Sequence, residues 1–145
     1  MPVVSLTRRV QFTARHRYGR ADWSEAQNAD AFGPASMRSN HEHRYTCDVT
    51  VSGTLDEATG MLADLRTIDR LLQQHVLGPF DGTTLNDDVA EFAGGTAMPT
   101  CENLARVIAR RLEGALCTTT PGVSLSRVTV VEDAALSATW DVAAG

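Results

Sequence analysis

Residues 41–54 alternate between two kinds of side chain, and this alternation limits the possible folds more than any other feature of the chain. Every second position carries a residue suited to a buried face: His41, His43, Tyr45, Cys47, Val49 and Val51. The positions between them are polar: Glu42, Arg44, Thr46, Asp48 and Thr50. Successive side chains of a β-strand point to opposite faces of its sheet, so the pattern predicts a strand with one buried face. That face begins with two histidines, which point to the same side.

Two helices are predicted in the middle and the second half of the chain. Apolar residues recur at helical spacing over residues 64–76, and Gly78-Pro79 marks the end of this helix. The second helix begins with Thr100 as its N-cap. The polar stretches at 18–40 and 79–98 are predicted as loops, and long ordered loops are often functional.

Three further strands complete the predicted order of elements. Residues 3–14 are rich in valine, leucine, phenylalanine and threonine, and they predict a strand that ends near His16. Residues 124–132 and 135–142 predict two strands joined by a tight turn near Asp133-Ala134. The order is therefore β-β-α-α-β-β, and no repeat or linker divides the chain.

Composition and charge restrict the class of protein. The 145 residues, of which 43% are hydrophobic, suffice for one compact domain, which we expect to span residues 1–145. The net charge is -5 and the 13 basic residues are all scattered arginines, so we expect no nucleic-acid partner and no membrane partner. The widely spaced Cys47, Cys101 and Cys117 favour a reducing compartment, and we recognise no signal peptide or membrane span. We therefore expect a cytoplasmic protein.

The chain contains 4 histidines, and His16, His41 and His43 fall at the ends of two predicted strands. His41 and His43 share one strand face, and a neighbouring strand that carries His16 can bring a third imidazole to the same point. Three neutral nitrogen ligands with an open fourth position are a common way to hold a catalytic zinc ion. The sequence therefore predicts a Zn2+ site at these three residues, with ordinary half-buried strand histidines as the alternative.

Several short motifs, taken in their order and spacing, resemble the 6-pyruvoyl-tetrahydropterin synthase and 6-carboxy-tetrahydropterin synthase family. They are Phe12-Thr-Ala-Arg-His16, Asp22-Trp-Ser-Glu25, His41-Glu-His43 followed by Tyr45, Gly60-Met61, Leu85-Asn-Asp87, Pro99-Thr-Cys-Glu-Asn-Leu-Ala105 and Val130-Val-Glu132. The resemblance covers the chain from Phe12 to about Trp140.

The resemblance implies the tunnelling fold, an α+β subunit with an antiparallel four-stranded sheet and two helices on one face. Such subunits join their sheets into a barrel, and trimers stack into hexamers with active sites at subunit boundaries. We therefore expect a homo-oligomer. Family members use zinc held by three histidines to convert dihydroneopterin triphosphate, which implies a pterin-like small-molecule substrate for this chain.

The resemblance also implies substrate-binding residues. Glu132 matches the family glutamate that accepts hydrogen bonds from the amine and ring nitrogen of the pterin, and a carboxylate offers two oxygens to two parallel donors. Glu102 and Thr100 match positions that line the pterin pocket. A glutamate in a first helical turn also interacts favourably with the helix dipole, so both interpretations of Glu102 are open.

This chain differs from the family at the positions of the family's reactive residues. An ungapped alignment of Phe32-Gly33 through His41 places Ala35 where the family has its nucleophilic cysteine. Of the family's Asp-His pair, Asp81 is present and Gly82 replaces the histidine. A well-placed acid or base contributes about 10²–10⁴ in rate, so the loss of both groups argues for altered chemistry.

Three residues are candidates for the missing catalytic groups, and Glu42 is the weakest because it should point to the opposite sheet face from His41 and His43. Asp81, alone or with a zinc-bound water, is the preferred base. Cys101 is a candidate for a relocated thiol because it precedes Glu102, although a small residue at a helix start is the favoured explanation.

We therefore expect a zinc-dependent lyase or cyclase that acts on a dihydroneopterin-type or related substrate by aldol, retro-aldol or elimination chemistry. One alternative is a non-catalytic pterin-binding or assembly subunit that keeps the fold and the zinc. The other is an ordinary synthase whose thiol is Cys101.

Overall fold

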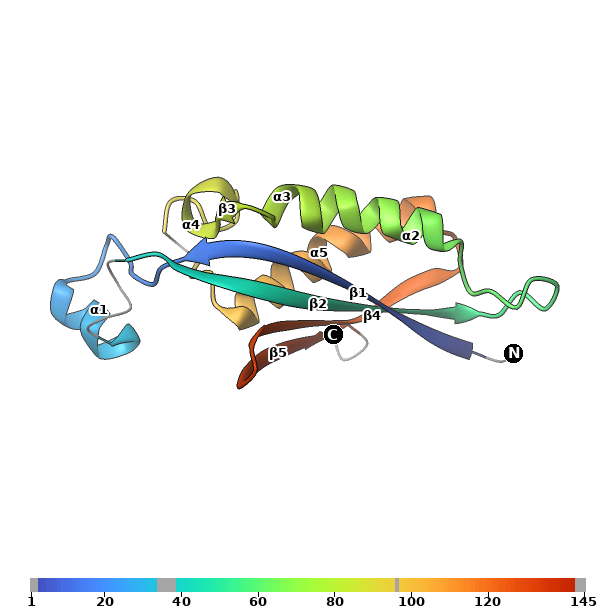
Figure 1. Ribbon diagram of the computed structural model, residues 1–145, viewed down its shortest axis with the longest axis horizontal. Helices are drawn as coiled ribbons and strands as arrows, with labels where there is room; N and C mark the ends of the chain where they lie inside the picture. The colour runs from blue at the N-terminus through green and yellow to red at the C-terminus, as the bar shows by residue number, and fades with distance from the viewer. Residues whose placement is uncertain (1–2, 34–38, 96, 143–145) are drawn as a thin grey trace.

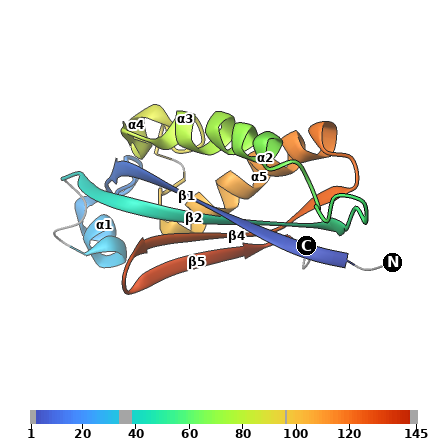
Figure 2. The same ribbon diagram turned by 45° about the vertical axis from the view of Figure 1, so that its right-hand side comes forward.

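The structure of the protein is a computed structural model that describes residues 3–33, 39–95 and 97–142. A twisted sheet forms one layer, and α2, α3 and α5 form a second layer over one of its faces (Figure 1). The elements are β1 Val3–His16, α1 Glu25–Phe32, β2 His41–Thr54, α2 Leu65–Leu72, α3 Gly78–Phe80, β3 Thr83–Thr84, α4 Leu85–Asp88, α5 Cys101–Thr119, β4 Val123–Asp133 and β5 Leu136–Asp141. The turned view in Figure 2 shows α2 and α5 on the same side of the strands.

The strand order is β3-β1-β2-β4-β5. The β1–β2, β2–β4 and β4–β5 pairs are antiparallel, which agrees with the predicted four-stranded sheet. The prediction was wrong in one respect, because the two-residue strand β3 adds a fifth member that runs parallel to β1. The β1–β2 register places His16 opposite His41.

The core lies between the sheet and the helices. The aliphatic and aromatic positions of the alternating segment, from Tyr45 to Val51, are at most 2% exposed, which confirms the predicted buried face. Phe12 of β1 stacks on Tyr45 with ring centroids 5.1 Å apart, and Phe80 also packs against Phe12, at 5.7 Å. Complete burial of such a side chain contributes roughly 1.5–3 kcal/mol.

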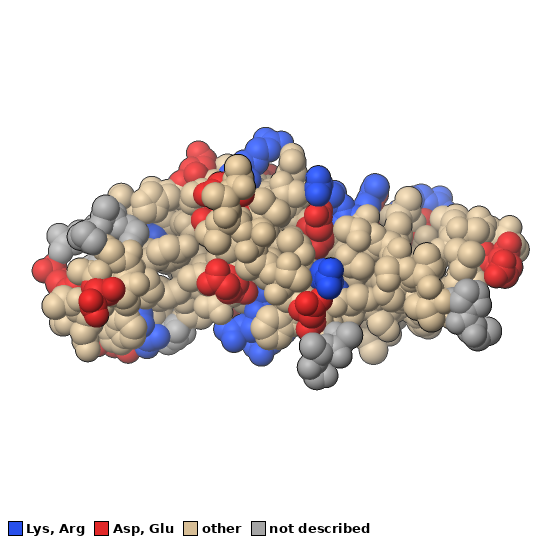
Figure 3. Space-filling view, turned by 90° about the horizontal axis from the view of Figure 1, so that it is seen from below, with Lys and Arg blue, Asp and Glu red and all other residues tan. Residues whose placement is uncertain are grey.

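The opposite face of the sheet is polar. Thr7 and Thr50 join across the β1–β2 pair through their hydroxyl groups, 2.7 Å apart, and Arg9 binds Asp48 at the same distance. Figure 3 views the molecule from this side, where acidic and basic residues are scattered among the others without an extended area of one sign. The helices therefore cover one face only.

The predicted helices are present, with one extension. Thr100 is the N-cap of α5 and accepts a hydrogen bond from the Asn103 backbone N–H at 3.1 Å, as expected. The first helix continues beyond its predicted end, because a π-helical turn at Gln73–Leu77 joins α2 to α3. Gly78-Pro79 therefore starts one more turn, since proline is tolerated in the first turn of a helix.

Both predicted loops contain regular structure. The stretch 18–40 contains α1, which begins at Ser24 with a capping box in which Gln27 returns the hydrogen bond. The signal Ser-x-x-Gln is in the sequence and would have indicated this helix. The stretch 79–98 contains β3 and α4.

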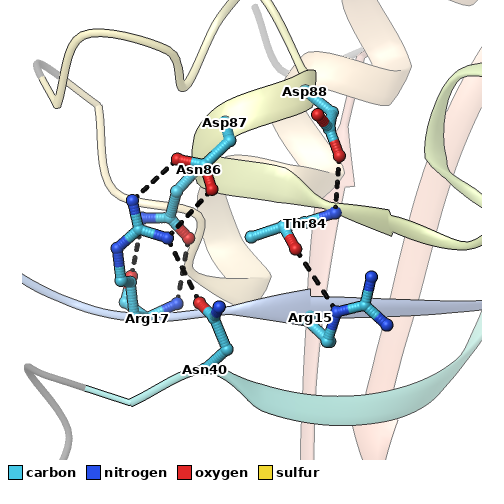
Figure 4. A network of polar contacts seen from close by, with 7 residues as sticks. All are labelled: Arg15, Arg17, Asn40, Thr84, Asn86, Asp87 and Asp88. Atoms are coloured by element: carbon cyan, nitrogen blue, oxygen red, sulfur yellow. Dashed lines mark hydrogen bonds and ion pairs between the residues drawn. The ribbon is translucent and has the colours of Figure 1, made fainter.

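The short helix α4 is tied to the end of β1, as Figure 4 shows. Asn86 accepts from the Arg17 backbone N–H at 2.9 Å and donates to the Arg17 carbonyl at 2.8 Å. The Arg17 side chain also pairs with Asp87 at 2.7 Å. These contacts fix the backbone that follows His16.

Within the described part of the chain, no helix has the length and apolar character that a membrane crossing requires.

Candidate metal and substrate site

Polar side chains replace apolar ones where the inward face of the sheet reaches one end of the core. His16 on β1 and Glu132 on β4 continue the inward positions of their strands, and they are 2% and 8% exposed. The first turn of α5 lies beside them, since Pro99 and Cys101 contact His16 and β4. The fold therefore buries titratable groups at this position.

His16 has one ring nitrogen engaged and the other directed at Glu132. Its Nδ1 lies 2.9 Å from the Pro99 carbonyl oxygen and 3.2 Å from the Tyr45 hydroxyl. A carbonyl only accepts, so Nδ1 carries the proton and Nε2 keeps its lone pair. A backbone carbonyl that fixes the tautomer in this way is typical of a histidine that binds a metal through its other nitrogen.

The structure brings His43 and Glu132 to this free nitrogen. Each of His16, His43 and Glu132 offers one possible ligand atom, and these three atoms lie within 4.8 Å of one another. The His41 ring is farther away, 6.3 Å from the His16 ring between centroids, whereas the His43 ring is at 4.9 Å. The donor set of imidazoles with a carboxylate beside them fits a zinc ion.

Electrostatics also favour metal binding by these histidines. Burial lowers the pKa of His16, and His43 and His41 lower it further, against the opposing effect of the Pro99 carbonyl. Metal binding requires the neutral imidazole, so a lowered pKa favours the form that acts as a ligand.

Glu132 is the least satisfied group in the site. Its Oε1 has no hydrogen-bond partner among the residues that the structure describes, and it lies 3.6 Å from His16 Nε2. Burial is the main cause that raises the pKa of Glu132. A buried carboxylate oxygen without a donor destabilises the ligand-free protein, so this oxygen indicates a site that a ligand completes.

The predicted residues at the start of α5 have different environments. Thr100 uses its hydroxyl as the helix cap, and Glu102 is exposed in the first turn. The Cys101 thiol is buried and donates to the Val130 carbonyl at 3.1 Å. Burial and the charges of Glu132 and Glu102 raise the pKa of Cys101 to about 11. A reactive cysteine has a lowered pKa, so these properties argue against a thiol nucleophile here.

Asp81 lies on the outer side of β1. Its Oδ1 accepts from the Thr13 backbone N–H at 2.9 Å, and the Gly82 N–H donates to the Thr13 carbonyl at 2.7 Å. Thr13 is three residues before His16, which is roughly 10 Å along a strand. The structure therefore places Asp81 away from the His16 site of its own chain.

Ala35, at the family's cysteine position, lies outside the described residues.

Tyr18 is a site residue that the sequence interpretation missed. Its ring lies 4.8 Å from the His16 ring, and burial followed by the charge of Glu132 raises its pKa. Tyr18 follows His16 by two positions, and this spacing was the available signal.

Comparison with known proteins gives a consistent result. A family model described as 6-pyruvoyl tetrahydropterin synthase matches residues 5–142. The 6-pyruvoyl tetrahydrobiopterin synthase of Drosophila melanogaster is 36% identical over 104 residues, which cover 72% of this chain and 61% of the fly protein. The corresponding human protein is 33% identical over 111 residues, 77% of this chain and 75% of its own length. The solved structure of Caenorhabditis elegans 6-pyruvoyl tetrahydropterin synthase has a TM-score of 0.86 at 29% identity and covers 97% of this chain and 96% of its own. This likeness confirms the predicted α+β tunnelling fold.

Proposed function

Because the chain belongs to the 6-pyruvoyl tetrahydropterin synthase family, we propose that it is a zinc-dependent lyase acting on the side chain of a dihydroneopterin-type substrate. The observation that carries the proposal is the buried Oε1 of Glu132, which has no hydrogen-bond partner among the described residues and lies 3.6 Å from the free nitrogen of His16. Glu132 would bind the substrate ring and His16 would bind the metal, so the ring and the metal would lie next to each other in one site.

Glu132 would bind the heterocycle. A carboxylate with a free oxygen accepts hydrogen bonds from adjacent N–H groups, and a buried position excludes competing water. Glu102, exposed at the start of α5, and the Thr100 cap would line the rim of this pocket. The pterin class of substrate is supported by the family and by this match of acceptor to donors.

His16, His41 and His43 would hold the zinc ion. When bound there, zinc polarises the oxygens of the substrate side chain. The His41 ring lies 6.3 Å from the His16 ring between centroids, so His41 would have to move closer to His16 to complete the three-histidine set. Pro99 holds the His16 tautomer that this role requires.

We assign the base to Asp81 of a neighbouring subunit. Asp81 is exposed on the outer side of β1 and lies away from the site of its own chain, which suits a site shared across a subunit boundary. Homo-oligomers place the same surface of each copy in equivalent contacts, so one Asp81 can serve each site. With a single base and no thiol, retro-aldol or aldol chemistry or elimination is the expected reaction. We expect this activity in the cytoplasm.

The test is turnover by the zinc-loaded protein. Dihydroneopterin and its triphosphate are incubated with the wild type and with His41→Ala, and the products are separated and identified by mass spectrometry. We expect product from the wild type only. Full activity of His41→Ala would overturn the zinc role, and tight pterin binding without any product would identify a non-catalytic binding subunit instead.

A mixing experiment tests the shared site. Asp81→Asn and His43→Ala are each expected to be inactive. Hybrids assembled from both variants contain sites with one intact His43 and one intact neighbouring Asp81, so they should regain part of the activity. Hybrids as inactive as the separate variants would show that Asp81 is not the base contributed by a neighbour.

A further inference from the structure

The backbone on both sides of Tyr18 is held rigidly. Asn86 brackets Arg17 with two hydrogen bonds of 2.9 and 2.8 Å, and this pair is seen in Figure 4. On the other side, the Gly19 N–H lies 3.4 Å from the Met98 sulfur. Tyr18 is therefore positioned by its neighbours and needs no ligand to order it.

The ring of Tyr18 is packed between the candidate metal ligand and α1. Its centroid lies 4.8 Å from that of His16 and 5.9 Å from that of Phe32. Two ring contacts on different elements fix the direction of the phenol, because the ring has only two side-chain torsions. The phenol ring therefore has a defined place beside His16.

The hydroxyl itself has no hydrogen-bond partner in the described portions of the chain, although the residue is partly buried. His16 contacts both groups, because its ring centroid lies 4.8 Å from that of Tyr18 and its Nε2 lies 3.6 Å from Glu132 Oε1. Glu132 Oε1 is likewise unpartnered. A donor and an acceptor, both unused, thus border the same space.

We propose that the Tyr18 hydroxyl donates a hydrogen bond to a ring carbonyl of the ligand while Glu132 accepts from the adjacent ring N–H and amino group. This inference rests on the proposed function and adds a specificity residue to it. Together the two side chains would recognise the amide edge of a heterocycle, in which a carbonyl lies next to an N–H. They would disfavour a ring with an amino group in place of the carbonyl, because two donors would then face each other.

The test compares two ligands and two proteins. Pterin carries the carbonyl, and 2,4-diaminopteridine carries an amino group at the same position. Their dissociation constants are measured by fluorescence titration against the zinc-loaded wild type and Tyr18→Phe, which keeps the ring contacts with His16 and Phe32. We expect Tyr18→Phe to bind pterin about tenfold more weakly, since one hydrogen bond is lost, and to bind the diamino compound with unchanged or higher affinity.

Each outcome has a distinct meaning. Zinc content and melting temperature of Tyr18→Phe serve as controls and should equal those of the wild type. A shift in the ratio of the two dissociation constants supports the inference. An unchanged ratio with tight pterin binding overturns it and leaves the proposed function standing. If the zinc-loaded wild type binds neither pteridine, the pterin function itself fails, and this inference is overturned with it.

Discussion

The substitution Glu132→Gln should make the ligand-free protein more stable and remove its response to ligand. Glu132 is 8% exposed, its Oε1 lies 3.6 Å from His16 Nε2, and no described residue donates a hydrogen bond to this oxygen. Both atoms are acceptors when His16 is neutral. Glutamine removes the buried charge and can turn an N–H toward His16 Nε2.

The size of the effect follows from these contacts. An unsatisfied buried polar group costs about 1–3 kcal/mol, and a new hydrogen bond contributes about 0.5–1.5 kcal/mol. Glutamine also leaves its own amide oxygen in the site, so we expect a gain of about 1–2 kcal/mol. For a chain of this size that corresponds to a rise in melting temperature of roughly 3–8 °C.

The assay is thermal unfolding of metal-free protein, with and without pterin. Glu113→Gln is the matched control, because the same change on an exposed position of α5 should leave the melting temperature nearly unchanged. In the wild type, pterin at 100 times its dissociation constant adds about 2.7 kcal/mol, and Glu132→Gln should lose this response. A loss of stability in metal-free Glu132→Gln would refute the reasoning, since it would mean that the carboxylate is a satisfied structural group.

The pH dependence has a definite sign. Burial raises the pKa of Glu132 in the folded protein above the ordinary value of about 4.3 in the unfolded chain. The folded state therefore binds the proton more tightly, and the penalty of the buried carboxylate is absent below the unfolded pKa and complete above the folded pKa. The advantage of Glu132→Gln over the wild type should shrink as the pH falls toward about 4.

Three further predictions concern other parts of the account. Iodoacetamide at neutral pH should modify the exposed Cys117 and spare the buried Cys101 and Cys47. Burial raises the pKa of Cys101 to about 11 and that of Cys47 to about 12. Peptide mass spectrometry of the native protein checks this, and rapid labelling of Cys101 would support the thiol interpretation. Asp81→Asn should lower turnover by about 10²–10⁴ while zinc content stays constant, and a smaller loss would exclude Asp81 as the base. Asn86→Ala should lower the free energy of unfolding by about 1–3 kcal/mol, measured by urea titration, because the Arg17 backbone groups lose both partners.

The sheet and the main helices could be predicted because local patterns determine them. The alternation from His41 to Val51 indicates one buried face, and the burial of Tyr45 and the residues after it confirms this. Thr100 as N-cap of α5 is likewise a local signal. The strand β3 could not be predicted, because its two residues pair with β1 only through the turn that Asp81 and Gly82 attach to Thr13.

The site was predicted only in part, for a physical reason. Strand periodicity places His41 and His43 on one face, but it does not show that Glu132 lies beside His16. That proximity depends on the order of β1, β2 and β4 in the sheet. The role of Pro99, whose carbonyl fixes the His16 tautomer, is equally a matter of tertiary packing. Asp81 stays a prediction, since its proposed site lies in a neighbouring subunit.

The central claim is that three histidines hold zinc and leave Glu132 free for the substrate. The most direct measurement is zinc affinity, determined by competition with a chromophoric chelator, for the wild type, His41→Ala and Glu132→Gln. The account predicts that His41→Ala loses more than about 100-fold in affinity, beyond the usual effect of an outer-shell change, whereas Glu132→Gln stays within about tenfold of the wild type. A large loss in Glu132→Gln with wild-type affinity in His41→Ala would contradict it, because the metal would then be bound by His16, His43 and Glu132.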